Sequence, residues 1–122
     1  MSLPGDQPRV YNTAALHRPS NFLCIAEGEP DTWTATQAGL PCVGLPGVSS
    51  FRDYMPRLFA GYEKIYVLAD NDDKGQGLEF GEKIAERVPN TRVMLMPEGH
   101  DVNSFVLEQG PEALLDRLEI KK

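Results

Sequence analysis

The chain has 122 residues, which is enough for a single domain with a buried core. Its 18 acidic and 12 basic residues give a formal net charge of −6, which argues against a domain that grips nucleic acid with a basic face of its own. No apolar run approaches the roughly 20 residues of a membrane span, and no apolar signal segment precedes residue 20. We therefore predict a cytoplasmic protein without membrane contact.

The first 20 residues contain three prolines and show weak periodicity, so we predict a partly extended lead-in over residues 1–20. The domain itself is predicted to cover residues 21–122. Cys24 and Cys42 lie in apolar stretches 18 positions apart. That spacing fits neither a disulfide framework nor a zinc site, and it favours buried structural thiols.

From residue 21 onward, strand patterns and helix patterns alternate along the chain. Short apolar runs predict strands over residues 21–27, 41–47, 63–70 and 91–97. Helices are predicted over residues 30–39, 49–61, 74–90, 101–110 and 111–119. The helix over 74–90 has a stripe formed by Phe80, Ile84 and Val88, which is predicted to face the core.

This alternation is typical of an α/β fold of Rossmann-like type. We expect a four-stranded, mainly parallel sheet with right-handed crossovers and helices on both faces. Functional sites of such folds lie beyond the carboxyl ends of the strands. If the strand order is 2-1-3-4, the first and third predicted strands are neighbours and their carboxyl ends adjoin.

Acidic residues follow three of the four predicted strands. If that strand order holds, four carboxylates share one crevice, and Asp31 overhangs it from the first turn of the next helix; the four are Glu27, Asp70, Asp72 and Asp101. Like charges this close repel one another, by about 1 kcal/mol even in water. Carboxylate oxygens are the ligands that Mg²⁺ and Mn²⁺ prefer, so the cluster predicts a divalent cation.

The acidic run after the third strand is also compatible with a role at a helix start. Asp70 could be a helix N-cap, with Asp72 and Asp73 placed favourably on the helix dipole, and for Asp73 this is the interpretation we prefer. A calcium-binding EF-hand loop starting at Asp70 is rejected. Its fifth position is Lys74 and its twelfth is Gly81, where a bidentate glutamate is required.

Three motifs together resemble the signatures of the Toprim domain. They are E-G-x-x-D at residues 27–31, D-x-D-x-x-G at 70–75, and the aspartate after the fourth strand in "LMPEGHDVN". The details look most like DNA primases of phage, prophage or bacterial type. The sequence departs from bacterial primases at Asp101-Val102-Asn103, where they tend to have D-P-D, so the last candidate ligand is a weaker amide.

The resemblance implies roles for individual residues. Glu27, Asp70 and Asp72 would be catalytic, and Mg²⁺ or Mn²⁺ would bind to Glu27, Asp31, Asp70, Asp72 and Asp101. Gly28, Lys74 and Asn103 would be nucleotide-binding residues. For Lys74, which could contact a phosphate, a solvated lysine at the helix start is the interpretation we prefer.

The function implied is Mg²⁺-dependent synthesis of RNA primers on single-stranded DNA. Primases of this type also use a basic N-terminal subdomain and often a zinc-binding module, and neither is evident here. We therefore expect an excised catalytic domain, with little or no activity alone. It would meet DNA, nucleoside triphosphates and a replicative helicase through its parent protein.

Other functions remain open at this point. A Toprim nuclease or recombination module would share the same metal site, although no P-loop is present. A metal-binding fold without activity is a further alternative. A signalling receiver domain is a distant one, because it needs an acidic pair after the first strand and a lysine after a fifth.

Overall fold

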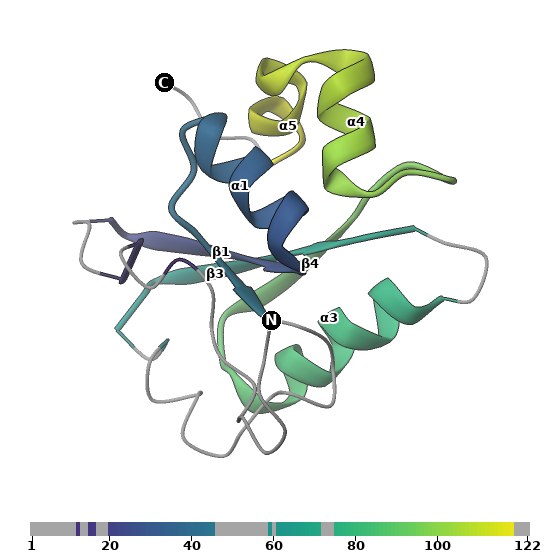
Figure 1. Cartoon of the computed structure of the whole chain (residues 1–122). Helices are drawn as coiled ribbons and strands as arrows, with labels where there is room; N and C mark the ends of the chain where they lie inside the picture. Colours follow the sequence, from purple (N-terminus) through teal and green to yellow (C-terminus); the bar gives the residue numbers. More distant parts are fainter. Residues whose placement is uncertain are drawn as a thin grey trace, which may run out of the picture.

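The computed structural model describes residues 12, 15–16, 20–45, 59, 61–71 and 75–118. Four strands form one parallel sheet in the order β2-β1-β3-β4 (Figure 1). The strands are β1 (Phe22–Glu27), β2 (Cys42–Leu45), β3 (Lys64–Ala69) and β4 (Thr91–Leu95). The predicted α/β class, the parallel pairing and the strand order are confirmed.

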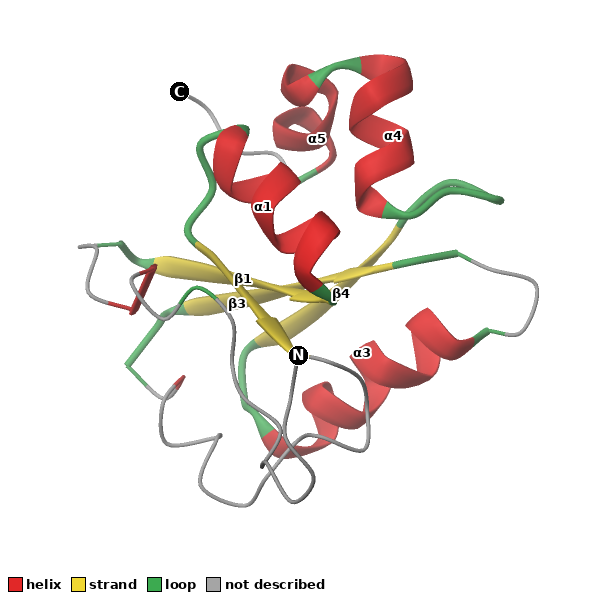
Figure 2. Ribbon diagram, viewed as in Figure 1, coloured by secondary structure: helices red, strands yellow, loops and turns green. Residues whose placement is uncertain are grey.

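Helices cover both faces of this sheet. The helices are α1 (Glu29–Gln37), α3 (Gln76–Arg87), α4 (Val102–Gln109) and α5 (Pro111–Arg117). Figure 2 shows α1, α4 and α5 together on one face and α3 on the other. The helix predicted over residues 49–61 lies outside the described residues except for Phe59 and Gly61. None of the described helices has the length and apolar character needed to cross a membrane.

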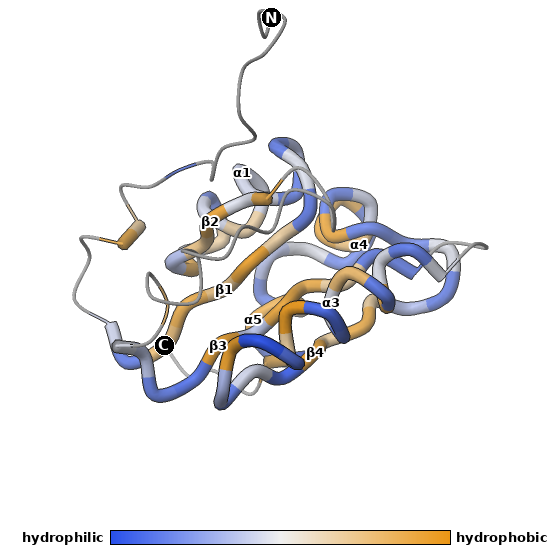
Figure 3. Tube along the Cα trace, turned by 90° about the horizontal axis from the view of Figure 1, so that it is seen from below, coloured by the Kyte–Doolittle hydropathy of each residue, from blue (hydrophilic) through white to orange (hydrophobic). Residues whose placement is uncertain are grey.

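The two faces of the sheet bury two separate hydrophobic clusters, because successive side chains of a strand point to opposite sides. On β1, Cys24 points into the cluster under α1, α4 and α5, whereas Ile25 points into the cluster over α3. The strands are therefore apolar along most of their length, as Figure 3 shows. The predicted stripe of α3 is confirmed: Phe80, Ile84 and Val88 are buried.

Part of the predicted lead-in contacts the sheet. The Asn12 amide donates to the Cys42 carbonyl oxygen at 2.9 Å and to the Thr36 hydroxyl at 3.1 Å. Ala15 is buried in the cluster over α3. Asn12 thus provides a donor for a carbonyl of β2, which pairs with β1 and is an edge strand of the described sheet. The boundary at residue 20 remains a prediction.

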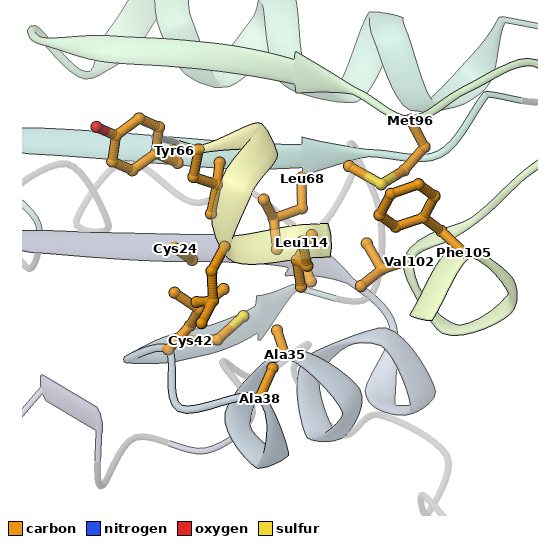
Figure 4. Packing of buried hydrophobic residues seen from close by; sticks show 14 residues of the cluster. Cys24, Ala35, Ala38, Cys42, Tyr66, Leu68, Met96, Val102, Phe105 and Leu114 are labelled. Carbon is orange, nitrogen blue, oxygen red and sulfur yellow. The ribbon is translucent and has the colours of Figure 1, made fainter. Parts of the chain in front are cut away.

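The two cysteines face each other across β1 and β2, and both are free and fully buried (Figure 4). Burial raises the pKa of the Cys24 thiol, and burial with the nearby Cys24 and Asp31 raises the pKa of the Cys42 thiol. Thiolate is the reactive form, so both side chains should be inert in the folded protein. The expectation of buried structural thiols is confirmed.

We predict that the native protein will not react with an aromatic disulfide reagent at mildly alkaline pH. In concentrated guanidinium chloride both thiols should react promptly, because unfolding removes the burial. The absorbance of the released thiolate measures both reactions. Fast labelling of the native chain would contradict the burial of the pair.

Candidate metal centre

The carboxyl edge of the sheet collects acidic side chains from three strand ends. Glu27 is the last residue of β1, Asp70 follows β3, and Asp101 follows the loop after β4. The charges of Glu27 and Asp101 both raise the pKa of Asp70, so these groups lie within electrostatic reach of one another. Asp72 and Lys74, predicted for the same site, lie outside the described residues.

Asp31 and Asp70 form the centre of this cluster. Asp31 is 4% exposed although it is an aspartate, and its side chain shares a hydrogen bond with that of Asp70. Burial, this hydrogen bond and the neighbouring acidic charges raise the pKa of Asp70 to about 8. Burial also raises the pKa of Asp31. We therefore expect the two carboxyls to share a proton in the metal-free protein near neutral pH.

Asp31 also holds the start of α4. Its Oδ1 accepts a hydrogen bond from the Asn103 main-chain N–H at 3.0 Å. This is one of the first N–H groups of α4, which have no partner within the helix. The Thr34 hydroxyl donates to Asn103 Oδ1 at 2.7 Å beside this contact. Asp31 and Thr34 thus join α1 to α4.

Asp101 is the N-cap residue of α4. Its Oδ1 accepts from the Ser104 N–H at 2.7 Å, and the Ser104 hydroxyl accepts from the Asp101 N–H at 3.1 Å. This reciprocal pair is a capping box. The capping alternative for Asp70 is wrong, because the N-cap residue of α3 is Gly75. Among the described helices, α4 is the one whose N-terminus is capped by an acidic residue, Asp101.

Gly28 turns the chain from β1 into α1. Its φ of 82° and ψ of 164° are accessible only to glycine at low cost. Its N–H donates to the Leu45 carbonyl at 3.0 Å, and its carbonyl accepts from the Thr32 hydroxyl at 2.6 Å. The E-G pair of the first motif therefore places Glu27 at the edge of the sheet and Asp31 in the first turn of α1.

Sequence reasoning missed two residues that support Asp70. An added Cβ on Gly77 would overlap the Asp70 carbonyl oxygen and lie 2.7 Å from its nitrogen, so α3 packs directly on that backbone. A glycine inside a helix costs about 1 kcal/mol of stability relative to alanine. A glycine within the predicted helix could therefore have indicated a close packing contact at Gly77. The second residue, Asn71, hydrogen-bonds to the loop after β4 and had no comparable signal.

The residues present fit a cation. Asp70 Oδ1 is buried and has no donor nitrogen or hydroxyl as partner in the described part of the chain. A buried carboxylate oxygen without a donor is costly unless a proton or a cation meets it. Among the described residues, no group of three or more potential ligands is close enough to hold a metal ion by itself. The described acids therefore remain candidate ligands, and the predicted ligand Asp72 lies outside the described residues.

Comparison with known proteins identifies the family. The Toprim-like family model matches residues 24–106. The chain belongs to the Toprim-like family. A relative, the Gene 57 protein of Mycobacterium phage D29, is 48% identical over 118 residues, covering 97% of this chain and 76% of its own length. The predicted Toprim resemblance is therefore confirmed.

Primases are among the proteins similar to this Toprim chain. A DNA primase of Chlamydia pneumoniae is 27% identical over 99 residues, which are 78% of this chain and 17% of that protein. The structure of the DnaG primase catalytic domain bound to ssDNA is 24% identical, with a TM-score of 0.70 over 91% of this chain. The chain spans 39% of that domain, so this Toprim fold corresponds to one part of a primase core.

We predict that Asp31→Ala will lower the free energy of unfolding by about 1–3 kcal/mol, because it leaves the Asn103 N–H at the start of α4 without its acceptor. Asp31→Asn should cost less, since Asn keeps an acceptor for the Asn103 N–H and gives Asp70 a donor. Denaturant unfolding in EDTA measures both, with Asp116→Ala on the exposed side of α5 as control. An Asp31→Ala variant as stable as the parent would contradict this role.

The pKa of Asp70 predicts a pH dependence of stability. Folded Asp70 binds its proton more tightly than an unfolded aspartate, whose pKa is about 4. The stabilisation is thus complete at acidic pH and is lost as pH rises from about 4 to about 8. In EDTA, the melting temperature of the parent should fall across this window more steeply than that of Asp70→Asn. Parallel curves for the two proteins would contradict the shared proton.

Proposed function

We propose that this chain is the metal-binding Toprim domain of a primase-like protein that synthesises RNA primers on single-stranded DNA with Mg²⁺. The observation that carries the proposal is Asp70 Oδ1, buried among acidic side chains and without a donor in the described part of the chain. The primase relatives and the general binding of divalent metals by Toprim domains support it. Mn²⁺ is expected to substitute for Mg²⁺, because both prefer carboxylate oxygens.

Asp70 and Asp72 are proposed to hold the metal, with Glu27 and Asp101 completing its surroundings. When bound, the cation would neutralise the clustered carboxylates and the phosphates of a nucleotide. Asp31 already gives Oδ1 to α4, so we propose that it supports Asp70 and meets the metal only through its other oxygen. Glu27 is proposed to be the general acid or base of nucleotide transfer.

The proposed nucleotide contacts lie at the same edge. Asn103 Oδ1 accepts from Thr34, and we propose that the Nδ2 group of Asn103 donates to a phosphate oxygen. Gly28 allows close approach of a ligand to the backbone because it has no side chain. Lys74 is proposed as a further phosphate contact.

The remaining parts of the reaction are proposed to come from the parent protein. The chain carries a net charge of −6, which opposes the approach of a polyanion. Its match spans 39% of the DnaG catalytic domain whose structure contains ssDNA. A basic N-terminal subdomain, a zinc module and a helicase are therefore the proposed partners for template binding, and the isolated chain should be nearly inactive.

We predict that Mg²⁺ will raise the melting temperature of the parent chain by several degrees. A ligand at about one hundred times its dissociation constant adds about 2.7 kcal/mol to stability. Asp70→Asn should lose most of this response while melting no lower than the parent in EDTA, because it relieves the repulsion. Scanning calorimetry with and without Mg²⁺ measures both effects.

The matched control is Glu86→Gln, the same change from carboxylate to amide at an exposed position in the last turn of α3. It should keep the full response to Mg²⁺. A parent chain indifferent to Mg²⁺, or an Asp70→Asn variant that responds like Glu86→Gln, would overturn the proposed metal site.

A further inference from the structure

The loops that follow β3 and β4 are held together beyond the end of the sheet. The last bond of the strand pair is from the Met96 N–H to the Ala69 carbonyl, at 2.9 Å. Asn71 then makes three more hydrogen bonds to the same loop. Its side-chain Nδ2 donates to the Met96 carbonyl at 2.9 Å, its N–H donates to the His100 carbonyl at 2.9 Å, and its carbonyl accepts from the Gly99 N–H at 3.0 Å.

These contacts join the immediate chain neighbours of two acidic residues. Asn71 follows Asp70, and His100 precedes Asp101. The hydrogen bond between Asn71 and His100 therefore fixes the distance between the main chains of Asp70 and Asp101. Gly77, packed on the Asp70 backbone from α3, restricts movement on the other side.

An asparagine suits this position for a physical reason. The main-chain hydrogen bonds between the loops do not depend on which side chain residue 71 carries. The Met96 carbonyl, just after β4, instead receives its hydrogen bond from the side chain of residue 71, which must therefore be a donor. The Asn71 amide supplies that donor and carries no charge. An aspartate there would direct a carboxylate at a carbonyl oxygen and add a further negative charge to the cluster.

We propose that Asn71 is a positioning residue of the metal centre, which holds Asp70 and Asp101 at the separation that a divalent cation requires. The proposal rests on the proposed function, because it assigns Asn71 a role toward the metal. It differs from a simple structural role in one respect. A bond that only stabilises the loop changes the free energy of unfolding, whereas a positioning bond also changes metal affinity.

The test compares Asn71→Ala with a matched control, Thr91→Val. The Thr91 hydroxyl donates to the Val88 carbonyl at 2.8 Å at the other end of β4, so the control removes the same kind of bond away from the acids. We expect Asn71→Ala to weaken Mn²⁺ binding about tenfold or more in titration calorimetry, equivalent to about 1.4 kcal/mol. Thr91→Val should leave Mn²⁺ affinity within about twofold of the parent value.

A second measurement uses the parent chain, in case Asn71→Ala does not fold. If the hydrogen bonds between the loops favour metal binding, bound Mg²⁺ must in turn stabilise those hydrogen bonds. Mg²⁺ should therefore slow hydrogen exchange at the Asn71 and Gly99 amides. Exchange at these amides that is indifferent to bound Mg²⁺ would overturn the proposal. So would an Asn71→Ala variant with parental Mn²⁺ affinity.

The two proposals fail in distinguishable ways. A parent chain that binds no Mn²⁺ overturns the proposed function and the positioning role together. A parent that binds Mn²⁺ with an affinity that Asn71→Ala does not change overturns the positioning role alone.

Discussion

The site depends on two carboxyl groups in contact, Asp31 and Asp70. Each is partly or wholly withdrawn from water, and two ionised carboxylates in this position would repel strongly. The protein tolerates them because they have different partners. Asp31 Oδ1 accepts from the Asn103 N–H at the start of α4, while Asp70 Oδ1 has no donor in the described part of the chain. Of these two oxygen atoms, Asp70 Oδ1 is therefore the one that a proton or a cation would stabilise more.

Asp31 also joins α1 to α4, which lie on one face of the sheet. The N-terminus of a helix carries a partial positive charge, and Asp31 brings a carboxylate from α1 to that of α4. Asp101 caps α4 through its own side chain at the same time. Packing of Val102 and Phe105 onto the apolar cluster then buries the inner side of α4. Fold and site thus depend on one another here, and changes at Asp31 affect both.

The sequence was sufficient to predict that acidic residues gather at the carboxyl edge of the sheet, where the candidate site lies. Alternating strand and helix patterns imply a parallel sheet, and acidic residues after three strands mark its carboxyl edge without knowledge of any contact. The partners of those acidic residues were not predictable in this way. Asp31 meets the N–H of Asn103, which is 72 positions away, and Thr34 meets the Asn103 side chain 69 positions away. Such bonds depend on how two helices dock, for which neither residue carries a local signal.

Most of the groups that place Glu27 and Asp70 carry no charge themselves. Glu27 is placed by the backbone turn at Gly28, Asp70 by the contacts of Asn71 and Gly77, and the start of α4 by the capping box of Asp101 and Ser104. Exchanging the Asp70 carboxylate for an amide removes charge and leaves these supports intact. Exchanging a support moves the carboxylates while their charges remain. We therefore expect that the charge of the candidate site can be changed at Asp70 without moving its backbone, and that the position of Asp70 can be changed at Asn71 without changing its charge.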